Sequence, residues 1–326
     1  MPADLLLIGG TFFGYGSELV AYLTARGRNV LWFDDRPAAD AATKAMLRLA
    51  PGLMARKTKE HAVAIRDRAK AEAIRDVLVI KGEGLSGDDV GMLRRALPSA
   101  RFILYFWDSY GNMPKDSPGK VAHFDRAFTF DPRDAERDPR LAYRPLFFLD
   151  EFRQLTAVPR DIDLLFFGTA HTDRYMVLMR LAKTLPPHVR LETVLYLPSR
   201  LIYAVRRSFD FRFWGARRRQ FIFKPLDRAA IRGLMSRARA IIDIERAVQS
   251  GLTMRCVEAF GAGRKIITTN PSIAGADFYH PDNIAVVDRE RPRIPEDFLD
   301  RPYAPVPPEV IERYTLARWV SEVLGL

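Results

Sequence analysis

Short apolar runs alternate with longer amphipathic stretches along this chain of 326 residues, and the alternation occurs in two successive series. Apolar runs bounded by turn residues are typical of buried strands, whereas the stretches between them have the spacing of helices. This order predicts parallel sheets covered by helices. Because the length exceeds the usual size of one hydrophobic core, we expect two domains.

The first series begins with the apolar run 5–8, followed by the loop GGTFFGYG, a helical stretch and a second run that ends at Asp34 and Asp35. Further strands are predicted at 76–80, 101–106 and 127–130, with a helix at 86–97 and helical composition from about 37 to 75.

The second series begins with the apolar run 162–169. Predicted helices follow at 174–184, 228–237 and 253–261, and predicted strands at 191–197, 240–244 and 265–268. Prolines interrupt the passage between the two series, so we place the boundary there. The prediction is two Rossmann-like α/β domains, 1–155 and 156–307, with a terminal helix within 308–326 that packs back on the first by fold analogy.

Composition narrows the class of protein. With 48% hydrophobic and 28% charged residues the chain has the composition of a globular enzyme. No apolar run is long enough to span a bilayer and no basic leader opens the sequence, so we expect a cytoplasmic protein. The single cysteine, Cys256, excludes an internal disulfide, and the five histidines lack metal-ligand spacing. We expect no metal.

The positive charge is concentrated in one stretch. The formal net charge is +11, and residues 200–239 hold twelve Lys/Arg against Asp210 and Asp227. Such a stretch suits nucleic acid, anionic lipid or phosphorylated small molecules, although a solvated basic face has the same composition. Arginines here alternate with Phe209, Phe211, Phe213 and Trp214. That pattern favours an anionic membrane surface or single-stranded nucleic acid, and a plain surface loop stays open.

The passage 249–263 carries the strongest binding signal. The turn Gly251, Leu252, Thr253 leads into a short helix whose first amides suit a phosphate. Arg255 and Glu258 lie three apart on that helix, where the arginine can hold a diphosphate and the carboxylate can accept ribose hydroxyls. An ordinary ion pair on the helix surface is the alternative.

Residues 243–288 resemble the C-terminal domain of GT-B glycosyltransferases, in particular CgeB-like and group-one enzymes of lipopolysaccharide and capsule biosynthesis. The resemblance covers roughly 161–288 and is architectural before that. It implies two domains facing across a cleft, a nucleotide-diphosphate sugar as donor substrate held mainly by the second, and a glycan or lipid-linked acceptor held by the first. It further implies that no additional cofactor and no obligatory metal are needed.

The resemblance also assigns residues. Glu258 matches the carboxylate that contacts the ribose or sugar of the donor, and Gly251, Leu252 and Thr253 match the turn near the diphosphate. Ser250 stands where the family's Glu-x7-Glu pattern has its first glutamate. The acid that contacts the sugar hydroxyls is therefore unassigned, and Asp243 and Glu245 match only loosely.

The end of the first strand of the second series is another candidate for the donor phosphates. Gly168 and Thr169 end the strand, and His171 and Arg174 follow where open α/β sheets bind ligands. His171 can equally be an ordinary loop histidine. Lys224 is a lone cation in an apolar context, and related enzymes use a basic residue in this part to offset charge on the leaving diphosphate. A solvent-exposed lysine is the alternative.

An inverting transferase needs a base that deprotonates the acceptor hydroxyl, whereas a retaining one does not. Asp108 and Glu83 each follow a predicted strand of the first domain and are the candidates. The loop GGTFFGYG lacks the GxGxxG spacing, but Asp34 and Asp35 keep an NAD-type enzyme open as an alternative. A non-catalytic nucleotide or nucleic-acid binding protein is the third interpretation.

We therefore expect a metal-independent glycosyltransferase of cell-surface polysaccharide biosynthesis. We expect the protein to be cytoplasmic and to bind peripherally at the inner face of the membrane. We do not expect nucleic acid to be its partner.

Overall fold

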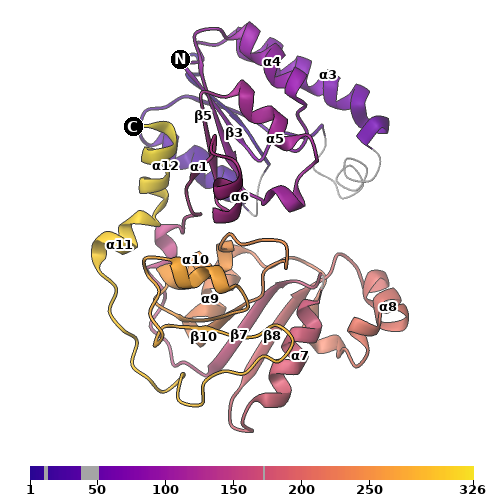
Figure 1. The fold of residues 1–326 in the computed structure, drawn as a ribbon, viewed down its shortest axis with the longest axis vertical. Helices are drawn as coiled ribbons and strands as arrows, with labels where there is room; N and C mark the ends of the chain where they lie inside the picture. Colours follow the sequence, from indigo (N-terminus) through magenta and orange to yellow (C-terminus); the bar gives the residue numbers. More distant parts are fainter. Residues whose placement is uncertain (11–13, 38–50, 172) are drawn as a thin grey trace. The chain divides into compact units, whose positions relative to one another are not determined.

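The computed structural model describes residues 1–10, 14–37, 51–171 and 173–326. It divides into two compact units, Met1–Pro145 with Trp319–Leu326 and Leu146–Arg318 (Figure 1). Residues 146–155 thus belong to the second unit, and the chain returns to the first unit from Trp319 onward. Part of the loop GGTFFGYG, residues 11–13, and part of the expected helical stretch, residues 38–50, lie outside the described residues.

The first unit contains a parallel sheet with the strand order β2-β1-β3-β4-β5-β6. Its strands are short runs of apolar residues, and those of β1 and β3 are buried along their whole length. The strands are β1 (Leu5–Ile8), β2 (Val30–Phe33), β3 (Asp76–Ile80), β4 (Arg101–Phe106), β5 (Arg126–Thr129) and β6 (Ala142–Tyr143).

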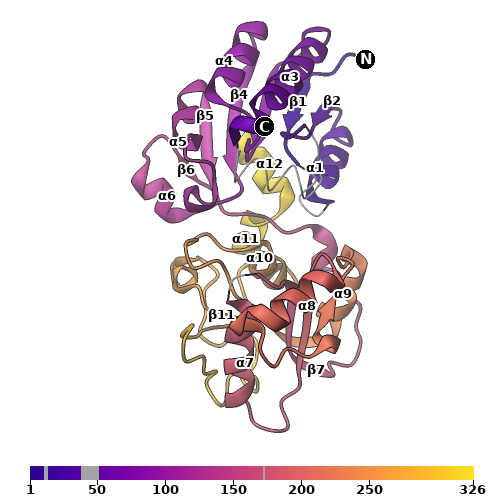
Figure 2. The same ribbon diagram turned by 90° about the vertical axis from the view of Figure 1, so that its right-hand side faces the viewer.

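Helices cover both faces of this sheet, with α3, α4 and α5 on one side and α1 and α12 on the other (Figures 1 and 2). They are α1 (Tyr15–Thr24), α3 (Pro51–Lys70), α4 (Gly87–Ala96), α5 (Ser117–Lys120), α6 (Pro132–Arg137) and α12 (Leu316–Leu324). Helix α4 begins where Ser86 and Asp89 form a capping box. Trp319 of α12 is buried and packs edge-to-face on Tyr105, which attaches the terminal helix to this unit.

The second unit contains a parallel sheet with the order β12-β11-β10-β7-β8-β9. Numbered within this unit, the order is 3-2-1-4-5-6, the arrangement of dinucleotide-binding folds. The strands are β7 (Ile162–Thr169), β8 (Leu191–Tyr196), β9 (Phe221–Ile222), β10 (Ala238–Asp243), β11 (Lys265–Thr268) and β12 (Ile284–Val286).

Around this sheet α7 and α8 lie on one side and α9 and α10 on the other (Figure 1). The helices are α7 (Arg174–Thr184), α8 (Arg200–Phe209), α9 (Arg228–Arg237), α10 (Met254–Gly261) and α11 (Pro308–Arg313). Short 3-10 turns lie at Tyr110–Asn112, Val121–His123, Asp150–Phe152, Phe211–Phe213, Arg218–Gln220 and Pro271–Gly275. The predicted class, two Rossmann-like α/β domains, is confirmed.

Candidate functional site

The direction of the strand order reverses between β7 and β10, which are neighbours in the second sheet. Open α/β sheets bind ligands outside the carboxyl ends of the strands at such a point. Strand β7 ends at Gly168 and Thr169, and β10 ends at Asp243. The predicted loop with His171 and Arg174 follows the first of these strands, and the predicted turn at Gly251 follows the second.

Arg174 is the first residue of α7 and is buried, with 7% of its surface exposed. Its Nε donates to the carbonyl of Ile244 at 2.7 Å, and its Nη1 donates to the carbonyl of Thr169 and to Nε2 of His171 at 3.2 and 2.9 Å. Among the described residues no carboxylate bonds to it. A buried cation that no carboxylate contacts is costly even with the charges of Asp243 and Glu245 nearby, so this guanidinium favours an anionic ligand.

Burial and then the nearby charge of Arg255 lower the pKa of Arg174 to about 9, so the side chain stays charged at neutral pH. The pKa of His171 is also lowered. Burial and then the charge of Arg174 lower its pKa to about 3. Because a guanidinium can only donate, Nε2 of His171 accepts and the ring proton sits on Nδ1. His171 is therefore neutral at physiological pH and brings no positive charge to this loop.

Arg255, on α10, crosses to the end of β7. Its Nη1 lies 2.8 Å from Oδ1 of Asp243, and its Nε donates to the carbonyl of Phe167 at 2.7 Å. The guanidinium passes directly over Gly168, where φ is +151° and a Cβ would lie 2.3 Å from Nη2. A residue without a side chain is required there. Of the two arginines predicted to contact a diphosphate, Arg255 thus has a carboxylate partner and Arg174 does not.

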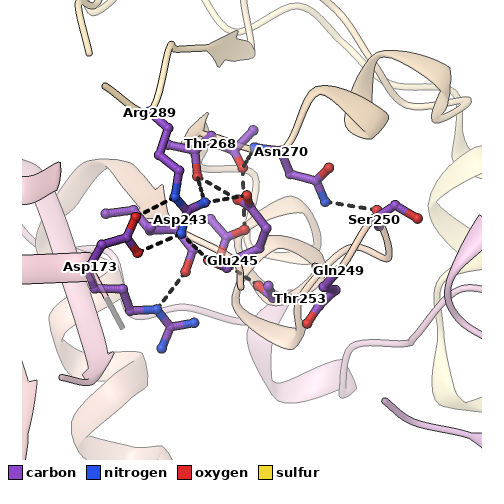
Figure 3. A network of polar contacts seen from close by, with 12 residues as sticks. Asp173, Asp243, Glu245, Gln249, Ser250, Thr253, Thr268, Asn270 and Arg289 are labelled. Atoms are coloured by element: carbon purple, nitrogen blue, oxygen red, sulfur yellow. Dashed lines mark hydrogen bonds and ion pairs between the residues drawn. The ribbon is translucent and has the colours of Figure 1, made fainter. Parts of the chain in front are cut away.

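Asp243 also sets the beginning of α10. Its Oδ1 accepts a hydrogen bond of 2.6 Å from Oγ1 of Thr253, and the same hydroxyl caps the helix by accepting from the amide of Cys256. The side chain of Asn270 donates to the carbonyls of Ser250 and Gly251 at 2.9 and 3.3 Å, which fixes the turn before the helix (Figure 3).

The same turn presents unpaired amides. Within the described ranges, the backbone N–H groups of residues 251–255 donate to no acceptor, although the carbonyl of Gly251 accepts from the side chain of Gln249. Unpaired amides at a helix start carry partial positive charge and bind anions. Two independent features, these amides and the buried Arg174, therefore point to one anion site at the carboxyl edge of β7 and β10.

The structure places the other two predicted residues differently. Glu258 lies inside α10 and only 5% of its surface is exposed, so the helix directs it inward. Lys224 follows β9 and is exposed, and it forms no hydrogen bond or ion pair with any residue that the structure describes. Because β8 separates β9 from β7 in the sheet, Lys224 lies apart from the loops after β7 and β10.

A second ionic group beside this site is one that the sequence analysis missed. Arg289 lies 2.7 Å from Asp173, at the start of α7, and 2.6 Å from Glu245, which follows β10 (Figure 3). The pKa of Glu245 is raised, mainly because the side chain is buried. Arg289 thus joins the loops after β7 and β10. The signal in the sequence was a charged residue within four positions after each of these apolar strands, including Arg289 after the strand that ends at Val286.

The predicted base candidates of the first unit are brought together by a lysine. Nζ of Lys81 lies 3.0 Å from Oε2 of Glu83 and 3.3 Å from Oδ2 of Asp108. The three residues follow β3 and β4, and the strand order of this sheet reverses between β1 and β3. Both carboxylates therefore share one cation at the carboxyl edge of the sheet.

Asp35 holds the loop after β3 through hydrogen bonds to its backbone. Its Oδ2 accepts from the amides of Glu83 and Gly84 at 2.7 and 3.3 Å. A Cβ at position 84 would lie 2.0 Å from the carbonyl oxygen of Asp35, so glycine permits this close approach. Burial and the neighbouring charge of Asp34 raise the pKa of Asp35 to about 6. Asp35 thus accepts hydrogen bonds from the loop after β3. In a dinucleotide-binding enzyme, an acid at the end of β2 would instead bind the ribose hydroxyls.

The described part of the chain contains no group of three or more His, Cys, Asp or Glu side chains placed to hold a metal ion. None of the helices described is both long and apolar enough to cross a membrane.

No family model and no curated protein matches the sequence. Solved structures match over most of the chain. A glycosyltransferase from Rickettsia africae aligns over 99% of this chain and 97% of its own with a TM-score of 0.60 and 11% identity. HepE of Anabaena, in complex with UDP and glucose, aligns over 89% and 87% with a TM-score of 0.54 and 12% identity.

A UDP-GlcNAc 2-epimerase from Methanocaldococcus jannaschii aligns over 100% of this chain and 99% of its own with a TM-score of 0.53 and 10% identity. At such low identity the likeness concerns the fold and leaves the reaction open. With its two parallel sheets and these structural neighbours, the chain has the two-domain α/β fold known as GT-B.

Proposed function

We propose that this protein is a glycosyltransferase that moves a sugar from a nucleotide-diphosphate donor to a glycan or lipid-linked acceptor in cell-surface polysaccharide biosynthesis. The observation that carries the proposal is Arg174, a buried cation that no described carboxylate contacts, at the same carboxyl edge of β7 and β10 as the unpaired amides of residues 251–255. Two neighbours in the same fold support it, since one is described as a glycosyltransferase and the other was solved with UDP and glucose.

In this proposal the diphosphate lies between Arg174 and the amides of Gly251 to Thr253. Gly168 and Thr169 allow its close approach to the backbone, and His171 lies in the same loop within reach of the phosphates. Glu258 accepts from the ribose or sugar hydroxyls, as the family resemblance implies. The arginine and the helix dipole neutralise the leaving diphosphate, so no divalent metal is required.

The acceptor chemistry is assigned to the first unit. Glu83 or Asp108 takes the proton of the acceptor hydroxyl, whose oxygen forms a bond to the anomeric carbon while the bond to the donor phosphate breaks. The nucleoside diphosphate is the leaving group. Lys81 forms an ion pair with each of these carboxylates and so holds both at the carboxyl edge of the first sheet.

Ligand-induced stabilisation tests the donor site. UDP, GDP, CMP, NAD and a short oligonucleotide are compared by thermal unfolding, and we expect a nucleoside diphosphate to stabilise the protein by about 2.7 kcal/mol at a hundred times its dissociation constant. Arg174→Met should remove this response. Because the variant also leaves the carbonyls of Ile244 and Thr169 without their donor, its unfolding without ligand is measured to show that it still folds.

Lys224→Met is the matched control, since it removes one charge from an exposed side chain and should leave the response intact. Stabilisation by NAD alone or by the oligonucleotide alone would contradict the proposal. A nuclear magnetic resonance time course with a UDP-sugar and no acceptor separates transfer from epimerisation. Conversion of the sugar to its 2-epimer without an acceptor would assign the epimerase reaction instead.

A further inference from the structure

The outward side of helix α8 is apolar. Leu201, Val205 and Phe209 recur at intervals of four and so lie on one side of the helix. Their side chains are 73%, 49% and 86% exposed. Ile202 and Tyr203, on the inner side, pack against the core of the second unit. The helix is thus held by its inner side, while a stripe of large apolar side chains faces solvent.

The chain after α8 extends this stripe. Phe211 and Trp214 are 65% and 67% exposed, while Phe213 between them is buried in the core. The buried phenylalanine holds this turn in place, so its neighbours are presented outward by an ordered segment. In Figure 1 α8 lies at the outer edge of its unit, beyond α7. Exposed apolar side chains gathered on one surface are typical of an interaction site.

Arginines surround the apolar stripe. Between Leu197 and Asp227 the only acidic residue is Asp210, and both of its oxygens accept from Arg212 at 2.8 Å. Further arginines are exposed and form no ion pair with any described carboxylate; they are Arg200, Arg207, Arg217, Arg218 and Arg219. We call these arginines, with Leu201, Val205, Phe209, Phe211 and Trp214, the α8 surface.

We propose that the α8 surface binds an anionic lipid bilayer. Apolar side chains of an interfacial helix insert at the boundary of headgroups and acyl chains, while guanidinium groups pair with lipid phosphates. The aliphatic side chains of Leu201 and Val205 favour a bilayer over single-stranded nucleic acid. Acyl chains accept aliphatic side chains, whereas bases stack on aromatic rings and gain little from them.

The α8 surface is connected to the donor site through its inner side. Nη1 of Arg206 donates to the carbonyl of Ala170 at 2.6 Å, one residue before His171. Membrane contact would therefore hold the loop after β7 near the bilayer. The consequence that a lipid-linked acceptor is supplied from this bilayer rests on the proposed function, whereas the membrane contact itself does not.

Vesicle sedimentation with the full chain tests the contact without donor or acceptor. Vesicles of phosphatidylcholine with phosphatidylglycerol should bind the wild type at low salt, and pure phosphatidylcholine should bind it far less. Because each arginine near an anionic surface contributes about fivefold in partitioning, the triple variant Arg217→Gln, Arg218→Gln, Arg219→Gln should bind roughly a hundredfold more weakly. Its matched control removes three exposed charges elsewhere in the same unit, Arg160→Gln, Lys183→Gln and Arg293→Gln.

Substitution of the apolar stripe tests insertion separately from charge. Leu201→Ser should reduce vesicle binding, while Leu53→Ser should not, because the two leucines are 73% and 74% exposed and only the first lies on the α8 surface. Brominated lipids should quench the fluorescence of Trp214 in the bound protein, and Trp214→Phe should remove that quenching.

Equal loss of binding with the control triple, or no effect of Leu201→Ser, would overturn the proposal. Tight binding of a short single-stranded oligonucleotide that depends on Arg217 to Arg219, without vesicle binding, would assign the surface to nucleic acid. Stabilisation by UDP is measured on the same variants. A wild-type protein that UDP stabilises but that binds no vesicles would overturn the membrane proposal alone. A wild-type protein that binds vesicles but that no nucleoside diphosphate stabilises would overturn the proposed function alone.

Discussion

The guanidinium of Arg255 occupies the space that a side chain at position 168 would need. A Cβ built on Gly168 lies 2.3 Å from Nη2 of Arg255, and this arginine pairs with Asp243 on the neighbouring strand. The end of β7, the end of β10 and the start of α10 are therefore held together by one side chain. The geometry of the anion site depends on this packing.

Gly168→Ala should destabilise the protein and weaken donor binding. The methyl group displaces Arg255 and the backbone keeps a φ that alanine rarely adopts, so we expect a loss of about 2–5 kcal/mol in the free energy of unfolding. Gly233→Ala, in the middle of α9 with open space around it, is the control and should stabilise by up to about 1 kcal/mol. Chemical denaturation of both variants measures the difference, and equal stability of the two would contradict the role given to Gly168.

His171 should make the stability of the protein sensitive to acid. Its folded pKa of about 3 lies below the ordinary value of 6.5, so below pH 6.5 the unfolded chain takes up a proton that the folded chain does not. Stability from this group is complete above pH 6.5 and falls as pH decreases toward 3, by about 1.4 kcal/mol per pH unit. His171→Gln can still accept from Arg174 and should lack this component. The measurement compares unfolding free energies of the two proteins across this range, and parallel curves would show that His171 does not contribute.

Glu258→Ala should abolish transfer and lower donor affinity, because the carboxylate is assigned to the donor hydroxyls. Since Glu258 is buried, thermal unfolding of the variant must show that it still folds. Glu258→Gln keeps the volume and removes the charge, so loss of turnover in a stable Glu258→Gln protein isolates the carboxylate. The exposed Glu192→Gln serves as a control and should behave as wild type. Wild-type donor binding and turnover in both Glu258 variants would remove α10 from the donor site.

Excess EDTA should leave the transfer rate unchanged, because cationic groups and helix amides are proposed to neutralise the diphosphate. Arg255→Ala should cost several kcal/mol in the transition state and should also lower the free energy of unfolding by about 3–5 kcal/mol, because the buried Asp243 loses its partner. Rate assays and denaturation measure the two effects separately. A rate that collapses with EDTA and returns with magnesium or manganese would place a metal at the diphosphate.

The sequence by itself determined the local elements of this protein. The strands at 76–80, 101–106 and 265–268 occur with the predicted bounds, because an apolar run between turn residues is set by the neighbours of each residue in the chain. The helix after Gly251 was predicted within one residue at its start, since Thr253 caps it locally. The order of such elements was sufficient to predict two parallel α/β sheets.

Only the tertiary structure decided which charges are paired. Arg174 bonds to Ile244, 70 positions along the chain, and Arg255 reaches Phe167 at a separation of 88. Such partners depend on β7 and β10 becoming neighbours in the sheet, which no local pattern encodes. For that reason the sequence could not show whether Arg255 and Glu258 form a pair on the helix surface. Nor could it show which side of α8 faces solvent. A guanidinium takes its partner from the strand ends that surround it, so the anion site exists only once the sheet has assembled.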